Sequence, residues 1–150
     1  MAGTYTRLLY HLVFSTKHRV PFIDAGLKSE LYPYMEGILR GRGGWLLALN
    51  GMPDHVHLLV RLKPDLSVSE TLRDLKACSS KWVHEQAGLP RDFAWQLGYA
   101  AFSVSESKEA TVRTYIQNQE KHHRRSTFQE ELIALLGKHQ VDYNPVYLWD

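Results

Sequence analysis

The alternation of hydrophobic and polar residues along the chain predicts four strands and four helices. Segments rich in β-branched, aromatic and other apolar residues predict strands at 7–16, 45–50, 55–62 and 99–105. Apolar residues spaced three or four apart predict helices at about 24–40, 67–86, 108–123 and 127–137. The order β-α-β-β-α-β is that of the ferredoxin-like fold. We therefore expect an α+β domain with an antiparallel sheet, helices on one face and additional C-terminal helices, and with the third strand beside the first in the centre.

Several helix ends carry recognisable capping residues. Asp24 can cap the first helix, and a serine at position 67 or 69 can cap the second. Thr127 with a glutamate three positions later has the spacing of a capping box. Pro33, inside the first predicted helix, indicates either a kink or a later start.

Length and composition limit the classes of protein that fit. A chain of 150 residues is expected to form one domain spanning 1–150. A net charge of +2 does not by itself indicate a nucleic-acid binder. The single cysteine, Cys78, excludes an intramolecular disulfide, and we expect it to be buried. No apolar stretch approaches the roughly 20 residues of a membrane helix, and no signal-peptide pattern is present. A cytoplasmic protein without a membrane partner is expected.

Two histidines flank a single apolar residue in the strand predicted at 55–62. Alternate residues of a strand project to the same face, so His55 and His57 converge on one spot. Histidine is the commonest transition-metal ligand. Taken alone, the pair more often marks the solvent-facing side of a strand, and an additional ligand is needed to favour a metal site.

Tyr115 and Gln119 are four positions apart in a predicted helix and therefore share one face. Gln119 could supply a carbonyl oxygen to an ion held by the two histidines. Tyr115 is either an amphipathic residue at the edge of the core or a nucleophile. Its phenol, with an ordinary pKa of about 10, needs a base or a cation to attack at neutral pH. A divalent ion on the phosphate would make phosphorus more electrophilic. Open mixed nitrogen and oxygen ligation suits Mg²⁺ or Mn²⁺ better than a structural Zn²⁺.

Together, these motifs resemble the small single-tyrosine transposases of the HUH superfamily, which belong to simple bacterial insertion sequences and are related to REP-associated tyrosine transposases. The segments that carry the resemblance are 10–14, 52–59, 115–119 and 147–149. The resemblance implies that His55 and His57 bind the divalent metal, that Tyr115 attacks DNA, and that Gln119 completes the metal site. It also implies an HUH transposase-like fold.

The resemblance implies a reaction and partners as well. Transposases of this kind are homodimers, and the helix that carries the tyrosine can complete the site of the partner subunit. They bind DNA hairpins at the ends of the element, cut one strand, keep the 5′ phosphate on tyrosine and rejoin the strand. We therefore expect a metal-dependent, single-stranded DNA transposase that binds DNA hairpins. Attack by Tyr115 within its own chain or across the dimer stays open.

Basic side chains near the two motifs are candidate contacts to DNA phosphates, although charged surface residues often have no partner. These candidates are Lys17, Arg19, Lys121, His122, Arg124 and Arg125. Asp54 is expected to stabilise a turn, with orientation of a histidine as its alternative role. Phe93 and Trp95 are expected to pack in the core, although they could stack on unpaired bases.

Three other functions fit parts of the pattern. The main alternative is a domesticated protein of the same fold that binds hairpin or REP DNA without active transposition. A ferredoxin-like RNA-binding domain is disfavoured because its aromatic strand signature is absent. A metal-dependent hydrolase of small phosphoesters would form no covalent tyrosine adduct.

Overall fold

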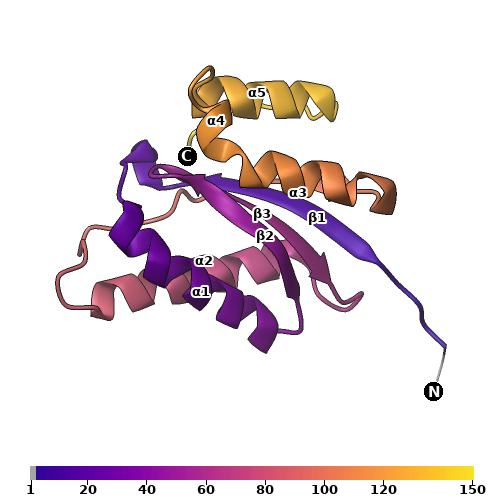
Figure 1. Cartoon of the computed structure of the whole chain (residues 1–150), viewed down its shortest axis with the longest axis horizontal. Coiled ribbons are helices and arrows are strands. Elements are labelled where there is room, and N and C mark those ends of the chain that lie inside the picture. The colour runs from indigo at the N-terminus through magenta and orange to yellow at the C-terminus, as the bar shows by residue number, and fades with distance from the viewer. Residues whose placement is uncertain (1–2) are drawn as a thin grey trace.

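The computed structural model describes residues 3–150 and contains one antiparallel sheet of four strands in the order β2-β3-β1-β4 (Figure 1). The strands are β1 (Leu8–Ser15), β2 (Trp45–Met52), β3 (His55–Leu62) and β4 (Ala100–Val104). The third strand lies beside the first in the centre of the sheet, as predicted.

Helices cover both faces of the sheet (Figure 1). The helices α1 (Ala25–Gly41) and α2 (Val68–Glu85) pack on one face. The opposite face carries α3 (Glu109–Gln117), α4 (Gln119–His122) and α5 (Phe128–Lys138). Short 3₁₀ turns, η1 (Lys17–Arg19) and η2 (Glu106–Lys108), follow β1 and β4. The predicted α+β architecture with additional C-terminal helices is confirmed.

Strand β3 is buried on both of its faces, so its alternation separates the core from the site. Val56 and Leu58 face α1 and α2 and belong to the main core. Leu59 points the other way, where it packs with side chains of β2 and α3. His55 and His57 share the face of Leu59 and have no solvent exposure. The alternative that these histidines face solvent is therefore wrong, because the C-terminal helices cover that face.

The capping residues define the helix ends. Asp24 accepts a hydrogen bond from the backbone N–H of Leu27, and Ser67 caps α2 in the same way. Thr127 forms the predicted capping box at the start of α5. Of the two alternatives that Pro33 left open, a later start of α1 is wrong, because the helix begins at the predicted Asp24 cap and runs through Pro33.

Two local predictions are corrected by the structure. The helix predicted at 108–123 is divided, because Asn118, with φ −97° and ψ 22°, interrupts it between α3 and α4. Cys78 is exposed on α2, since the buried side of that helix is formed by neighbouring positions such as Leu75 and Ser79. The expected core positions of Phe93 and Trp95 are confirmed.

Among the described residues, no helix combines the length and apolar character required to span a bilayer.

Candidate metal and nucleophile site

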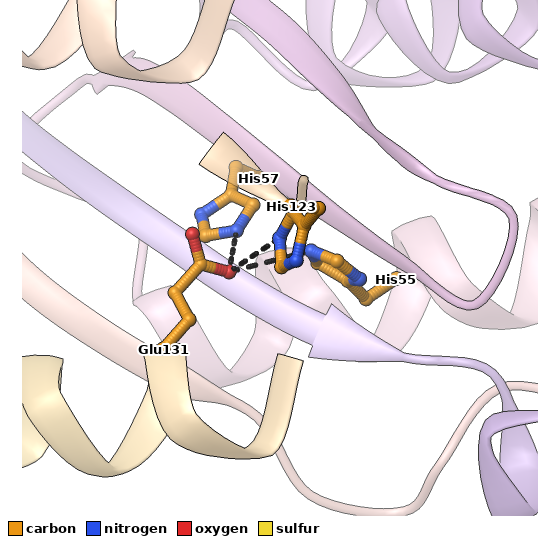
Figure 2. A group of neighbouring side chains, drawn as sticks. All are labelled: His55, His57, His123 and Glu131. Carbon is orange, nitrogen blue, oxygen red and sulfur yellow. Dashed lines mark hydrogen bonds and ion pairs between the residues drawn. The ribbon is translucent and has the colours of Figure 1, made fainter. Parts of the chain in front are cut away.

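Side chains from β3, α3, α4, α5 and the α4–α5 loop meet above the centre of the sheet. In Figure 2, His55, His57 and His123 surround the carboxylate of Glu131. His57 comes from the middle of the sheet, whereas Glu131 projects toward the sheet from the first turn of α5. The break after α3 and the turn after α4 bring His123 over the strand.

One carboxylate oxygen of Glu131 faces three imidazoles. Its Oε1 lies 2.8 Å from Nε2 of His57 and 3.1 Å from Nε2 of His123. Nε2 of His55 is 3.4 Å away from the same oxygen. The side chain of Glu131 is 1% exposed, so this carboxylate is screened from water and depends on these partners.

The second carboxylate oxygen of Glu131 faces the predicted nucleophile. Oε2 accepts a hydrogen bond from the hydroxyl of Tyr115 and another, at 3.0 Å, from the amide nitrogen of Gln119. The helix break at Asn118 does not separate Tyr115 from Gln119, because both side chains converge on this oxygen. The structure thus brings the predicted tyrosine, glutamine and histidine pair together around a residue that sequence reasoning did not select.

The donor set fits a divalent ion. One ligand atom from each of His55, His57, His123 and Glu131 lies within 4.8 Å of the others. Two ligand atoms that each lie about 2.0–2.2 Å from one ion can be separated by up to twice that distance, which is close to the spacing in this cluster. Nε2 of the neighbouring His122 is buried without a hydrogen-bond partner among residues 3–150, and it lies 3.3 Å from Oε2 of Glu131. His122 is therefore a further imidazole at the edge of the cluster, beside the oxygen of Glu131 that faces Tyr115.

Hydrogen bonds behind the histidines set their orientation. Nδ1 of His55 lies 2.7 Å from the Asp54 carboxylate, so its Nε2 points into the site. Nδ1 of His57 lies 2.9 Å from Nε2 of His11 on the neighbouring strand β1. Such outer partners fix the ring orientation of metal-binding histidines. Asp54 therefore both forms part of the β2–β3 turn and contacts a predicted ligand.

The buried charges shift one another's pKa. Burial alone would raise the pKa of Glu131, but hydrogen bonds with His123, His55 and His57 outweigh it and lower the pKa, so the carboxylate is ionised. Burial alone would lower the pKa of His55, but hydrogen bonds with the carboxylates of Asp54 and Glu131 raise it. The ionised Glu131 carboxylate therefore lies beside the hydroxyl of Tyr115, the predicted nucleophile.

Burial favours the neutral forms of His57, His11 and Tyr115. Burial lowers the pKa of His57 and, together with the proximity of His57, lowers the pKa of His11 to about 3. Burial and the Glu131 carboxylate raise the pKa of the Tyr115 phenol. The phenol therefore keeps its proton in this structure, and its attack requires a nearby cation or a proton acceptor.

Tyr115 lies between the buried site and an open cavity. Its ring packs with Leu59 and Ile116, and its edge approaches His57 with ring centroids 5.8 Å apart. On its other side it lines a cavity of about 500 Å³ together with Lys108 and Lys138. Two lysines therefore line the cavity on the side of Tyr115 away from the buried cluster.

The predicted DNA-contacting residues divide into two groups. Arg19, Arg124 and Arg125 line a common cavity of about 680 Å³ beside His123. Lys17 and Lys121 are exposed elsewhere and do not line it. His122 belongs to the site itself, with its ring 5.3 Å from that of Tyr115. Three of the six candidates are therefore brought together next to the cluster of histidines around Glu131.

Sequence reasoning missed three residues of this site: His11, His123 and Glu131. His123 belongs to a run of basic residues whose pattern predicts phosphate contacts or a solvated helix end, and not a metal ligand. Its spacing of four from Gln119 was an available signal. Glu131 follows the capping glutamate directly and is 74 residues from His57, so no local pattern connects the two.

Residues 4–119 match the family described as Transposase IS200 like. This chain belongs to the IS200-like transposase family. The matched region contains His55, His57, Tyr115 and Gln119, while His123 and Glu131 follow it in the chain.

Individual relatives agree with this assignment. The ISDra2 transposase TnpA of Deinococcus radiodurans is 26% identical over 122 residues, which cover 78% of this chain and 87% of that protein. The transposase for insertion sequence element IS200 of Salmonella typhimurium is 27% identical over 125 residues, covering 79% and 81% respectively. The chain is thus similar to transposases of insertion sequences.

Solved structures share the fold. A transposase structure from Deinococcus radiodurans R1 superposes with a TM-score of 0.62 at 29% identity, covering 79% of this chain and 95% of that one. A REP-associated tyrosine transposase bound to a REP hairpin gives a TM-score of 0.63 at 15% identity, covering 82% and 73%. The second likeness concerns the fold alone. The protein is therefore a transposase, an enzyme of DNA recombination with the fold of its family.

Proposed function

We propose that this transposase cuts and rejoins single-stranded DNA through a covalent 5′-phosphotyrosine at Tyr115, with a divalent ion held by His55, His57 and Gln119. One observation carries the proposal. The Tyr115 hydroxyl and the nitrogen atoms of both histidines contact the same buried carboxylate, that of Glu131. A phenol placed within reach of a metal-binding cluster is the arrangement that phosphoryl transfer requires.

The reaction exchanges one phosphate ester for another. The phenolic oxygen of Tyr115 forms a bond to phosphorus, and the bond between phosphorus and the 3′ oxygen of the preceding nucleotide breaks. The phenol proton leaves, and the departing 3′ oxygen takes up a proton. Attack by a 3′ hydroxyl on the tyrosine ester then reverses these changes and joins a new pair of ends. No external energy source is needed because each step conserves one ester bond.

The chain's own residues supply orientation and exclude water. Nε2 of His55 and Nε2 of His57 point into the site because Asp54 and His11 hold the opposite ring nitrogens. Oε1 of Gln119 lies 3.2 Å from Nε2 of His55, on the same side of the cluster. A divalent ion bound there, Mg²⁺ or Mn²⁺, supplies Lewis acidity to the phosphate oxygens.

Cavities on both sides of the site support binding of a nucleic-acid strand. Arg19, Arg124 and Arg125 line the cavity beside His123, and their guanidinium groups suit phosphate oxygens. A structural neighbour of the same fold is described with a bound REP hairpin. We therefore propose that the substrate is a DNA hairpin with a single-stranded extension that passes through the site.

We also propose a homodimer, as the family resemblance implies. In the single chain, the hydroxyl of Tyr115 and the histidines of the same chain share the Glu131 carboxylate. This contact supports attack within one subunit. Sedimentation analysis of the purified protein tests the dimer, and mixtures of a Tyr115 variant with a His57 variant test whether activity is restored across subunits.

The central experiment compares the wild type with Tyr115→Phe on a hairpin oligonucleotide labelled at its 3′ end. The label stays on the fragment whose 5′ phosphate becomes attached to the protein. We expect a labelled protein band on a denaturing gel for the wild type and none for Tyr115→Phe, with hairpin binding retained. Tyr34→Phe is a matched control, because Tyr34 stacks on Trp82 on the other face of the sheet. Wild-type amounts of adduct from Tyr115→Phe would refute the proposal.

A second function, binding of hairpin DNA without cutting, is favoured by one observation. The Tyr115 hydroxyl is already engaged by Glu131, and burial raises the pKa of the phenol. The same gel distinguishes the two functions. Tight hairpin binding by the wild type without any adduct, across Mg²⁺ and Mn²⁺ titrations, would favour the non-cutting protein.

A further inference from the structure

We propose that His123 and Glu131 are also ligands of the ion, and that Glu131 links the ion to Tyr115. This inference rests on the proposed function, since it extends the metal site through which Tyr115 would act. The resulting site has three imidazoles and a carboxylate, with the amide of Gln119 at its edge. Such a nitrogen-rich set favours a first-row transition ion such as Mn²⁺ over Mg²⁺.

The hydrogen bonds of His123 give the first argument. Its Nδ1 lies 2.8 Å from the carbonyl oxygen of Ser126, which can only accept, so Nδ1 carries the proton. Its Nε2 is therefore the ring nitrogen that faces the cluster. That nitrogen lies 3.1 Å from Oε1 of Glu131 and 3.0 Å from Oε1 of Gln119. With Nδ1–H engaged by a backbone carbonyl, Nε2 is the ring nitrogen that can serve as the ligand atom, and two oxygens of neighbouring ligands lie beside it.

His55 repeats this pattern from the strand. Its Nδ1 faces the carboxylate of Asp54, so this nitrogen also carries the proton. Its Nε2 faces Oε1 of Gln119 at 3.2 Å and Oε1 of Glu131 at 3.4 Å. The orientation of the Gln119 amide is fixed because its nitrogen donates to the other oxygen of Glu131. Two ring nitrogens and two oxygens therefore converge on one spot, as the ligand atoms of a metal site do.

Burial largely prevents water from forming hydrogen bonds with these groups. The side chains of His123 and Glu131 are 6% and 1% exposed. A buried carboxylate is costly unless it is paired or coordinates a metal. An ion shared by Glu131 and the three imidazoles would satisfy the carboxylate and the nitrogen lone pairs together.

The two oxygens of Glu131 give the carboxylate a second role. Oε1 faces the histidines, whereas Oε2 accepts the hydrogen bond of Tyr115. The carboxylate therefore acts as a positioning residue, which holds the phenol beside the metal-binding nitrogens. Loss of the carboxylate should weaken the site and release Tyr115 at the same time.

The test measures binding of Mn²⁺ alone and of Mg²⁺ alone by titration calorimetry, in full-length protein carrying Tyr115→Phe so that no chemistry intervenes. Glu131→Gln and His123→Asn are the test variants. Two exposed residues provide matched controls, Glu120→Gln and His18→Asn. We expect one Mn²⁺ per chain in the parent and both controls, a loss of affinity of at least about tenfold in each test variant, and weaker binding of Mg²⁺ than of Mn²⁺.

Co²⁺ absorption spectra give a second readout that does not depend on affinity. Removal of His123 as a ligand changes the ligand field and therefore the visible bands, whereas a structural substitution away from the ion leaves them unchanged. If Glu131→Gln unfolds, as judged by circular dichroism, Glu131→Asp keeps the charge but shortens the side chain, and the same affinity loss is expected. If Glu131→Asp binds Mn²⁺ as the parent does, Glu131 is not a ligand.

The failure of this inference differs from the failure of the proposed function. Parental Mn²⁺ affinity and Co²⁺ spectra in Glu131→Gln and His123→Asn, together with loss of binding in His57→Ala, would overturn the enlarged site and leave the smaller one in place. Absence of Mn²⁺ binding in the parent protein would overturn both. Tighter binding of Mg²⁺ than of Mn²⁺ would contradict the proposed ion preference.

Discussion

Nε2 of His11 lies 2.9 Å from Nδ1 of His57, across the pair of central strands β1 and β3. Both rings are buried, and their centroids are 5.1 Å apart. The contact occupies the ring nitrogen of His57 that points away from Glu131. His11 is therefore placed to keep Nε2 of His57 directed at the carboxylate of Glu131.

We expect His11→Phe to weaken Mn²⁺ binding by about tenfold, because the phenyl ring keeps the packing but removes the hydrogen bond to His57. Titration calorimetry measures the affinity, and the mid-point of thermal unfolding shows whether the variant folds. His139→Phe is the matched control, since His139 stacks on Phe102 at the surface and does not contact His57. A folded His11→Phe protein with unchanged affinity would show that the contact is not needed.

The tight turn between β2 and β3 leads to a prediction about stability. A Cβ atom on Gly51 would lie 2.1 Å from the backbone oxygen of His55 and 2.9 Å from Cα of Val56. Because both neighbours are backbone atoms, the strands must separate to admit a side chain. We expect Gly51→Ala to destabilise the protein by about 2 kcal/mol or more and to weaken Mn²⁺ binding, since His55 has to move.

Gly37 provides the matched control for this substitution. It is exposed in the interior of α1, and a Cβ atom there meets nothing within 4 Å. Gly37→Ala should therefore stabilise the protein by about 0.5–1 kcal/mol, through the higher helix propensity of alanine. Denaturant unfolding followed by circular dichroism gives both values. Equal effects of the two substitutions would show that close approach of the backbone at Gly51 is unimportant.

Much of the fold could be predicted because it follows from local patterns. The alternation in β3 places its residues on defined faces, and Thr127 marks the start of α5 three residues before its capping partner. The break at Asn118 could not be predicted, since neither glycine nor proline marks it. The expected burial of Cys78 is wrong. The apolar residues at 75 and 83 identify the buried side of α2, but they do not determine on which side of the helix Cys78 lies.

Only part of the candidate site could be predicted from the sequence. The spacing of His55 and His57 in a strand predicts that they share a face. The spacing of Tyr115 and Gln119 in a helix predicts the same for that pair. Glu131 has no such signal, because it reaches His57 only through the packing of α5 over the sheet. Contacts made by tertiary packing between distant segments are the part that periodicity does not encode.

The exposure of Cys78 predicts its reactivity. We expect Cys78 to react with 5,5′-dithiobis(2-nitrobenzoic acid) in the folded protein as fast as in the protein unfolded in denaturant, within about tenfold, because its thiol is exposed. Cys78→Ser is the control and should not react. A thiol that reacts only after unfolding would show that the cysteine is buried, as the sequence pattern had suggested.

Arg124 and Arg125 lead to a prediction about DNA binding, because both line the cavity beside the metal-binding cluster. Replacement of both by alanine should weaken binding of a hairpin with a single-stranded extension. The slope of log K against log salt should become smaller by about 1.4, or about 0.7 for each lost single-strand phosphate contact. Fluorescence anisotropy at several salt concentrations measures both quantities.

The control for this pair removes the same charge from the other face of the sheet. Arg40 and Lys81 are exposed on α1 and α2, and each forms an ion pair with a glutamate of its own helix. Their joint replacement by alanine should leave the salt slope unchanged, although it lowers the net charge equally. Equal losses of affinity in the two double variants would mean that overall charge, and not the cavity at Arg124 and Arg125, determines binding. A loss confined to the cavity pair would place the DNA backbone beside His123.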